Sequence, residues 1–242
     1  LKPIIKVKNL TKQFGHFTAI DNLTFDVYPG EIFGFLGANG AGKTTAIRIL
    51  CGLSKQSFGD AYVAGYSVKK SSEAIKKRIG YMSQKFSLYE DLTIEENIRF
   101  YGGIYGLKRK DLSFRMEELL NRLDIQSIRN QIIRFVPTGW RQKLAFSVAV
   151  LHRPAIVFLD EPTGGVDPAA RRQFWELIYE AADKGITVFV TTHYMDEAEY
   201  CDRVSIMTEG RIVALNTPDT LKKTYKADSI ENVFIKLARN RE

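Results

Sequence analysis

A glycine-rich segment carries the clearest chemical signal in the sequence. Residues 37–44 read GANGAGKT and stand at the end of an apolar segment, EIFGFLG, that is typical of a buried strand. The segment matches the pattern G-x-x-x-x-G-K-[ST], and it lies where that pattern requires it, between a strand and a helix. The glycines let backbone N–H groups turn toward phosphate oxygens, and the helix N-terminus adds partial positive charge. The sequence therefore predicts a site for a nucleoside triphosphate.

Separate roles are expected for the residues of this loop. We expect Lys43 to reach the β- and γ-phosphates and the Thr44 hydroxyl to coordinate Mg²⁺. The cofactors predicted from the motif are accordingly ATP and Mg²⁺. The expected nucleotide contacts in and next to the loop are Gly37, Ala38, Asn39, Gly40, Ala41, Gly42, Lys43, Thr44 and Thr45.

A second motif, IVFLDEPT at residues 156–163, places two acids at the end of an apolar strand. We expect the carboxylate of Asp160 to hold the Mg²⁺. At the end of a strand the chain can turn both acids into one cleft, where Glu161 would polarise a water molecule beside the γ-phosphate. The alternative is a strand that ends in two solvated acids, and the presence of Lys43 argues against it.

Together these motifs resemble, nearly end to end, the nucleotide-binding domain of ATP-binding-cassette (ABC) transporters. Such domains have an ATP-binding core and a helical subdomain inserted between the two motifs. Four further segments carry the resemblance: LTKQFG, YMSQKFSLYEDLTIEEN, GGVDP and VTTHYMDEAEYCDR. The resemblance implies that Phe14 stacks on adenine and that Gln84 contacts Mg²⁺ and couples to partners. It also implies that Asp167 reaches across a dimer and that His193 contacts the γ-phosphate.

Each of these four residues also has a simpler interpretation when it is taken alone. Phe14 could be a core aromatic, and Phe17 competes for its role. Gln84 would be an uninformative polar residue, and His193 would more often be a histidine at the end of a strand than a ligand. The order and spacing of the motifs make the set specific. His193, Lys43 and Glu161 are then the expected catalytic residues.

The segment VPTG, residues 136–139, departs from the family pattern. At this place the family has a Leu-Ser-Gly-Gly signature, which closes over the γ-phosphate bound to the other subunit of a dimer. The serine hydroxyl is missing here, and Pro137 offers no N–H in its place. The helix expected to begin near Gly139 would still present free N–H groups and a positive dipole end. We interpret Pro137, Thr138 and Gly139 as a degenerate signature that remains an anion site, with the Thr138 hydroxyl one position later.

The fold class expected is α/β: a P-loop NTPase core with a mostly parallel sheet, an N-terminal antiparallel β part and an inserted α-helical subdomain. The apolar strands AIVFL and ITVFVTT, separated by a helical segment, indicate a parallel sheet covered on both faces. Thr93 and Glu96 form a capping-box pattern before a helix. We expect one domain over 1–242, with the core at 1–86 and 153–224, the helical subdomain at 87–152 and a loosely attached tail at 225–242.

Composition places further limits on function. Of the 242 residues, 45% are hydrophobic and 26% charged, as in soluble globular proteins. No apolar run approaches the ~18 residues that a membrane helix needs. The net charge of +7 comes from short, scattered basic groups, which indicate solvated helix faces and, as a second interpretation, attraction to an anionic membrane surface. Cys51 and Cys201 are expected to be reduced structural thiols. The chain begins with Leu, so it could be an excised segment.

Within the family, the segment 136–168 is most similar to bacterial multidrug exporters related to the daunorubicin-resistance group. The expected function is ATP hydrolysis that powers export through separate membrane subunits, from the cytoplasmic face of the membrane. The chain would form a homodimer or pair with a second ABC cassette, with no nucleic-acid partner. Two alternatives stay open: a soluble ABC ATPase acting on ribosomes or nucleic acid, and a binding-only regulatory cassette with a degenerate signature. Glu161 and His193 argue against the second.

Overall fold

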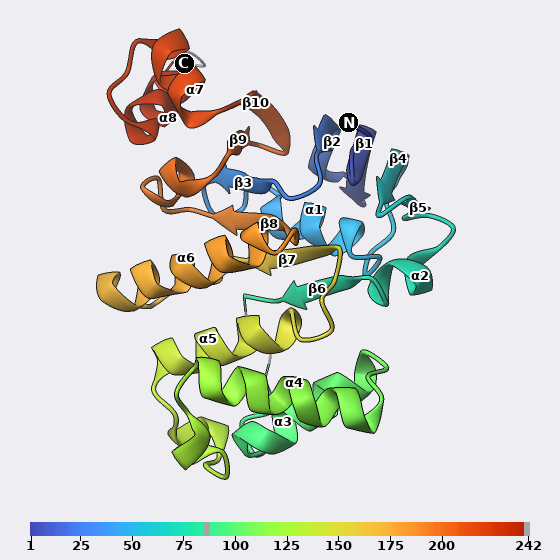
Figure 1. Cartoon of the computed structure of the whole chain (residues 1–242). Helices are drawn as coiled ribbons and strands as arrows, with labels where there is room; N and C mark the ends of the chain where they lie inside the picture. The colour runs from blue at the N-terminus through green and yellow to red at the C-terminus, as the bar shows by residue number, and fades with distance from the viewer. Residues whose placement is uncertain (85–87, 240–242) are drawn as a thin grey trace.

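A six-stranded, mostly parallel sheet forms the centre of the molecule (Figure 1). The computed structural model describes residues 1–84 and 88–239. The strand order is β10-β9-β3-β8-β7-β6, and only β10 runs antiparallel to its neighbour. The strands are β3 (Ile32–Gly37), β6 (Ile79–Met82), β7 (Ile156–Asp160), β8 (Thr187–Thr192), β9 (Arg203–Thr208) and β10 (Arg211–Asn216). All residues of β3, β7 and β8 are buried, as expected for parallel strands covered on both faces.

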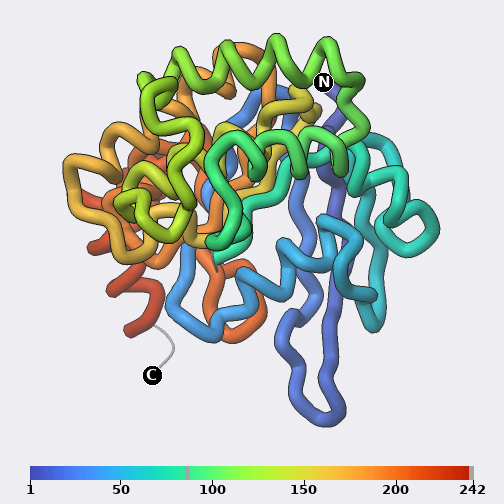
Figure 2. Tube along the Cα trace, turned by 90° about the horizontal axis from the view of Figure 1, so that it is seen from below, coloured from blue at the N-terminus to red at the C-terminus, as the bar shows by residue number. Residues whose placement is uncertain are grey.

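A second sheet is antiparallel and is built from the N-terminal part of the chain, with the order β2-β1-β4-β5. Its strands are β1 (Ile5–Phe14), β2 (Phe17–Val27), β4 (Phe58–Val63) and β5 (Tyr66–Ser67). The β1–β2 hairpin projects from the body of the molecule (Figure 2). Helix α1 (Lys43–Leu50) lies between the two sheets and shares one hydrophobic cluster with both of them. The expected antiparallel β part and P-loop core are both present.

The remaining helices cover the other face and the edge of the six-stranded sheet. They are α2 (Ser72–Lys76), α3 (Ile94–Ile104), α4 (Arg109–Arg122), α5 (Thr138–Ala149), α6 (Pro168–Asp183), α7 (Pro218–Tyr225) and α8 (Ile230–Arg239), with short 3₁₀ turns at Gln126–Ile128, Ile133–Phe135 and Glu197–Tyr200. Helices α3, α4 and α5 lie together beyond β6 (Figure 1), in the segment where the sequence predicts a helical insertion. The expected boundary between residues 86 and 87 lies outside the described residues.

Local sequence patterns set where several helices begin. Thr93 caps α3: its side chain accepts from the Glu96 amide, and the Glu96 side chain accepts from the Thr93 amide, so the predicted capping box is confirmed. Helix α5 begins at Thr138, next to the predicted Gly139, and Pro137 occupies its N-cap position with extended backbone. Helix α6 is capped by Asp167 and has proline at its start.

The expectation of a loosely attached tail is wrong for residues 230–239. They form helix α8, which packs on α7 and buries Ile230 and Val233 in the main hydrophobic cluster. The carboxylate of Glu199 accepts a hydrogen bond from the Ile230 amide and pairs with Lys222 of α7. The last three residues of the expected tail, 240–242, lie outside the described residues.

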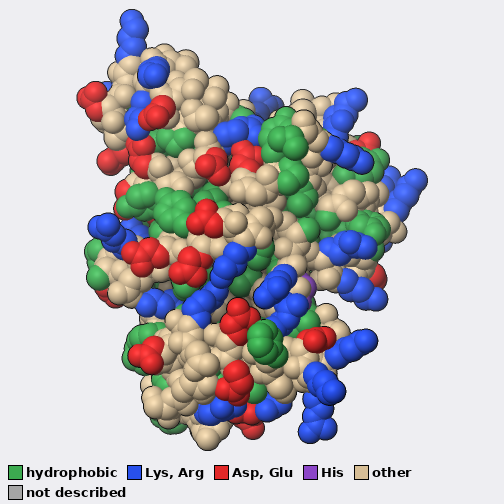
Figure 3. Space-filling view, in the orientation of Figure 1, with side chains coloured by type: hydrophobic (Ala, Val, Ile, Leu, Met, Phe, Trp, Pro, Cys, Tyr) green, Lys and Arg blue, Asp and Glu red, His purple; other side chains and the backbone are tan. Residues whose placement is uncertain are grey.

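Acidic and basic side chains are interspersed on the face seen in Figure 3, rather than segregated by sign. This distribution agrees with solvated helix faces as the main cause of the net charge. No helix in the described part of the chain combines the length and the apolar character needed to cross a bilayer. Cys51 and Cys201 are free and buried, and burial raises the pKa of both thiols.

Candidate functional site

The glycine-rich loop joins the end of β3 to the start of α1. Gly40 and Gly42 have positive φ angles of 82° and 103°, and a Cβ at Gly42 would lie 2.4 Å from the backbone oxygen of Ala19, so only glycine fits there. The amide groups of Lys43, Thr44 and Thr45 make no backbone hydrogen bond within the described part of the chain. These free donors at the helix N-terminus suit the phosphate oxygens of a nucleotide.

Thr44 and Asp160 face each other across the loop and the end of β7. The Thr44 hydroxyl donates to Asp160 Oδ1 at 3.1 Å, and Thr191 on β8 donates to the same oxygen at 2.8 Å. Burial raises the pKa of the Asp160 carboxyl; Glu161 adds to this shift, whereas the two hydroxyl donors and Lys43 oppose it. A hydroxyl and a buried carboxylate are oxygen ligands that fit Mg²⁺, which is often held by one or two carboxylates together with phosphates.

Glu161 is the residue on which the polar side chains of the site converge. Its Oε1 lies 3.2 Å from Lys43 Nζ, while its Oε2 lies 3.0 Å from Gln84 Nε2 and 3.1 Å from His193 Nδ1. Glu161 has a positive φ of 48°, which marks a sharp turn of the backbone directly after the strand. This turn directs Glu161 into the same site as Asp160. The structure therefore brings together six predicted site residues from separate parts of the chain: Lys43, Thr44, Gln84, Asp160, Glu161 and His193.

Comparison with known proteins identifies the family of this arrangement. The model of the ABC transporter family matches residues 20–164, which include the glycine-rich loop and both acids. The chain belongs to the ABC transporter family. The predicted resemblance is thereby confirmed.

Two curated relatives and one solved structure illustrate this membership. The probable multidrug ABC transporter ATP-binding protein YbhF of Escherichia coli is 45% identical over 97% of this chain and 41% of that protein. The daunorubicin resistance ATP-binding protein DrrA3 of Streptomyces coeruleorubidus is 35% identical over 95% of this chain and 73% of that protein. A solved ATP-binding subunit of an ABC transporter superposes with a TM-score of 0.88 and 29% identity, over 97% and 99% of the two chains. The chain spans about two fifths of the length of YbhF.

The predicted adenine contact of this ABC cassette lies at the tip of the β1–β2 hairpin. Phe14 and Phe17 are opposite each other in the hairpin register, and 53% and 64% of their surfaces are exposed. Phe14 is therefore not a core aromatic. Ala19, two residues after Phe17 on β2, touches the glycine-rich loop at Gly42. The Lys12 ammonium lies 4.7 Å from the centre of the Phe14 ring.

The segment predicted to be a degenerate signature lies at the N-terminus of α5. Pro137 and Thr138 are exposed, and Thr138 Oγ1 accepts a hydrogen bond from Arg141 at 3.2 Å. Asp167 is also exposed, and its side chain accepts hydrogen bonds from the amides of Ala169 and Ala170. In this chain Pro137, Thr138 and Asp167 lie outside the cluster around Glu161, and their action on a partner subunit stays a prediction.

Two residues that the sequence analysis did not single out complete the ABC site. Thr191 donates to Asp160, and its hydroxyl also accepts from the Glu161 amide at 3.0 Å. Glu197 is fully buried and accepts hydrogen bonds from Thr163 and Thr192, which flank Glu161 and His193 in sequence. The sequence offered one signal for Thr191, the two threonines that end the apolar segment ITVFVTT. In the parallel sheet Thr191 lies opposite Asp160.

Proposed function

We propose that this chain is the ATP-hydrolysing subunit of an ABC transporter that exports its cargo through membrane partner subunits. The observation that carries the proposal is the position of Glu161, which Lys43, Gln84 and His193 contact at 3.0–3.2 Å beside the Thr44–Asp160 pair. A carboxylate held at three points next to a phosphate loop is suited to general-base catalysis. The multidrug and drug-resistance names of the relatives support export as the direction of transport.

The side chains would divide the reaction among them. Lys43 and the free amides at the start of α1 would bind the phosphates, while Thr44, Asp160 and Gln84 would hold Mg²⁺. The metal, when bound, neutralises charge on the β- and γ-phosphates. Glu161 would accept the proton of the attacking water, and His193 would orient that carboxylate and contact the γ-phosphate. This division assigns a binding role to Lys43 and a proton-transfer role to Glu161.

Dimerisation would complete the site. Pro137, Thr138 and Gly139 of one subunit would close over the nucleotide of the other, and Asp167 would cross the same interface. The exposure of Pro137, Thr138 and Asp167 supports this role.

Residues 87–152, with the Gln84 loop, would act as the helical subdomain that passes motion to membrane partners, and residues 1–86 and 153–224 would form the ATP-binding core. A homodimer and a pair with a second cassette are both compatible with this surface. Bound to membrane subunits in this way, the chain would be peripheral, on the cytoplasmic face of the membrane.

The decisive experiment measures Mg²⁺-dependent ATP hydrolysis and ATP binding by the purified chain and two variants. Removal of a general base typically costs about 100-fold or more in rate, so Glu161→Gln should hydrolyse ATP at most at about 1% of the parent rate while still binding it. Lys43→Ala should instead weaken ATP binding itself, because it loses a charge-assisted contact to phosphate. Equal hydrolysis by Glu161→Gln and the parent would contradict the proposed base.

A second experiment tests the membrane partners. The Glu161→Gln variant, saturated with ATP, should remain in the closed dimer and retain its membrane subunits through purification from solubilised membranes. Recovery of ribosomal or nucleic-acid partners in their place would favour the soluble ABC alternative. If the chain binds ATP but shows no turnover, either when purified alone or when assembled with its partners, the regulatory cassette is favoured.

A further inference from the structure

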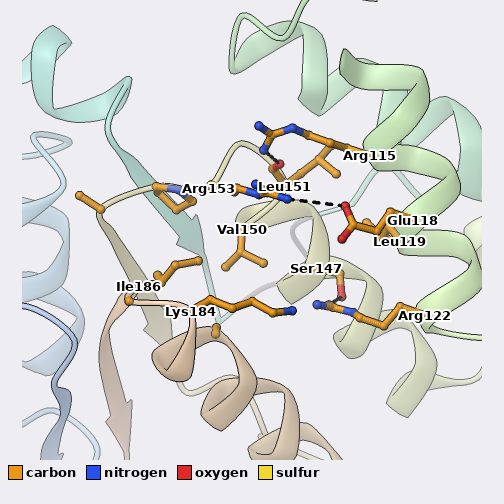
Figure 4. A pocket seen from close by; sticks show the side chains of 14 residues that line it. Arg115, Glu118, Leu119, Arg122, Ser147, Val150, Leu151, Arg153, Lys184 and Ile186 are labelled. Carbon is orange, nitrogen blue, oxygen red and sulfur yellow. Dashed lines mark hydrogen bonds and ion pairs between the residues drawn. The ribbon is translucent and has the colours of Figure 1, made fainter. Parts of the chain in front are cut away.

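A cavity of about 660 Å³ opens at the junction of α4, α5 and the end of α6 (Figure 4). Its lining includes Ala155 and Ile186, the residues directly before β7 and β8. Both strands end in the candidate ATP site, at Asp160 and Thr192. A strand of five or six residues is about 16–20 Å long, so the cavity and the ATP site lie at opposite ends of the same two strands.

Positive charge dominates the lining of this cavity. Four cationic side chains and one carboxylate contribute to it: Arg115, Arg122, Arg153, Lys184 and Glu118. They come from three separate segments, namely α4, the loop before β7 and the end of α6. In Figure 4, Arg122 and Lys184 extend toward each other across the cavity from opposite walls.

Three of the four cations are available to a ligand. Arg115 is held by the backbone oxygen of Leu151 at 2.7 Å. Arg153 has only a distant pair with Glu118, 3.9 Å between exposed side chains, and such pairs contribute little. Arg122 donates to Ser147 Oγ at 3.0 Å, with Glu180 3.8 Å away at the rim. Lys184 makes no ion pair among the residues that the structure describes.

The floor of the cavity is apolar. Leu119, Leu151 and Ile186 line it, and each is at least nine-tenths buried. Its volume lies within the range of small-molecule sites, which usually join an apolar wall to a few placed polar groups. An inorganic anion alone would leave the apolar wall unused, and a neutral apolar molecule would leave the cations unmatched.

We propose that this cavity binds a small molecule that joins one anionic group to an apolar body. The anionic group would lie between Arg122, Arg153 and Lys184, and the apolar body would cover Leu119 and Ile186. A compact aromatic acid and a short alkyl acid share this chemistry. Because the ligand would contact α4 and the end of α6 together, it would tie the helical segment to the core, at a distance from the nucleotide.

Calorimetric titration of the full chain tests this site. Naphthalene-1-sulfonate represents the aromatic acids and octanoate the alkyl acids, and excess Mg²⁺–ADP occupies the phosphate loop throughout. At least one probe should bind with a Kd below about 1 mM, as expected for a fragment-sized ligand, and the better probe identifies the ligand class. Inorganic phosphate should bind at least tenfold more weakly than that probe. Absence of binding by both probes, or equal binding of phosphate, would overturn the proposal.

Matched variants locate the binding. Arg122→Gln combined with Lys184→Gln should weaken the better probe about tenfold or more, since two charge-assisted contacts are lost. Lys108→Gln combined with Lys110→Gln removes two exposed charges at the start of α4, outside the cavity, and should leave binding unchanged. Ala155→Trp, which fills the cavity without changing charge, should also abolish binding. Unfolding temperature and ADP affinity confirm that each variant is folded. Equal probe binding by the parent and the Arg122/Lys184 variant would refute the site.

Discussion

Lys43 Nζ lies 3.2 Å from Glu161 Oε1, and the two side chains are only 3% and 7% exposed. The same ammonium donates to the backbone oxygens of Gly37 and Ala38, at 2.7 and 3.1 Å. The cation expected to bind phosphate and the expected general base are therefore ion-paired. Phosphate oxygens bound by Lys43 would compete with this carboxylate, so we expect nucleotide binding and the release of Glu161 to be coupled.

Glu161→Gln should destabilise the nucleotide-free chain and strengthen ATP binding. Replacing the carboxylate leaves the buried Lys43 without its counter-charge, which we expect to cost about 1–3 kcal/mol of unfolding free energy. The triphosphate restores a counter-charge, so ATP should raise the unfolding temperature more in this variant than in the parent. Thermal unfolding with and without ATP measures both effects. A smaller ATP-induced shift in the variant would show that the pair does not oppose binding.

The hairpin tip gives a prediction about the base of the nucleotide. Aromatic stacking on a base is worth about 1–3 kcal/mol in nucleic-acid complexes, so Phe14→Ala should raise the Kd for ATP about tenfold or more. Phe14→Tyr retains the ring and should be nearly silent. Phe17→Ala is the matched control, since Phe17 is also exposed and lies opposite Phe14 in the hairpin. If the loss of affinity follows Phe17 instead, the adenine lies on the other side of the hairpin.

The predictions that the structure bears out rest on short stretches of sequence. The glycine-rich loop, the capping box at Thr93 and the apolar strand before Asp160 are each defined within about ten residues, where local backbone chemistry decides the outcome. The hydrogen bond from Thr191 to Asp160 depends instead on the register of two parallel strands. For α8 the sequence did carry a local signal, since Ile230, Val233 and Leu237 recur at helical spacing, but its packing partner α7 is set by tertiary structure.

Glu197 provides a test of a positioning residue. It is fully buried and accepts hydrogen bonds from Thr192, next to His193, and from Thr163, two residues after Glu161. Glu197→Gln replaces one acceptor by a donor, so the turnover rate should fall several-fold while the KM for ATP stays nearly constant. Asp196→Asn alters the exposed neighbour and should have little effect on either. A proportional rise in KM would show that Glu197 supports binding rather than the geometry of His193.

His152 predicts a pH dependence of stability. Its ring stacks on Tyr105 with centroids 3.8 Å apart, and burial lowers the pKa of His152 from its usual value to about 4. The unfolded chain therefore binds a proton that the folded chain does not, and this contribution to stability is lost as pH falls from about 6.5 toward 4. The loss amounts to about 2–3 kcal/mol. His152→Phe keeps the stacked ring and should flatten this part of the profile in urea unfolding between pH 4 and 7. If the dependence of the unfolding free energy on pH is the same in His152→Phe and the parent, another group is responsible for it.

The N-terminus of α5 supplies the last prediction. Pro137 is its N-cap, and the Thr138 hydroxyl accepts a hydrogen bond from Arg141, which leaves its own O–H to donate from one position later in the chain. A serine at the N-cap would add a hydroxyl that can cap α5 or donate to a phosphate of the partner subunit. One charge-assisted hydrogen bond is worth roughly 1.5–3 kcal/mol, so Pro137→Ser should raise the ATPase rate of the homodimer about tenfold or more.

The assembly in which the chain works decides how far this gain extends. In a homodimer both nucleotides face a VPTG segment, so Pro137→Ser would improve both sites. Paired with a cassette whose signature carries the serine, this chain would supply only one weak signature, and the same substitution would change the rate of the pair much less. Pro137→Ala is the matched control, because it removes the ring and restores the N–H without adding a hydroxyl. A gain shared by the Ala and Ser variants would assign the effect to the backbone N–H. A rate unchanged by either would show that Thr138 and the free amides of α5 already make the contact.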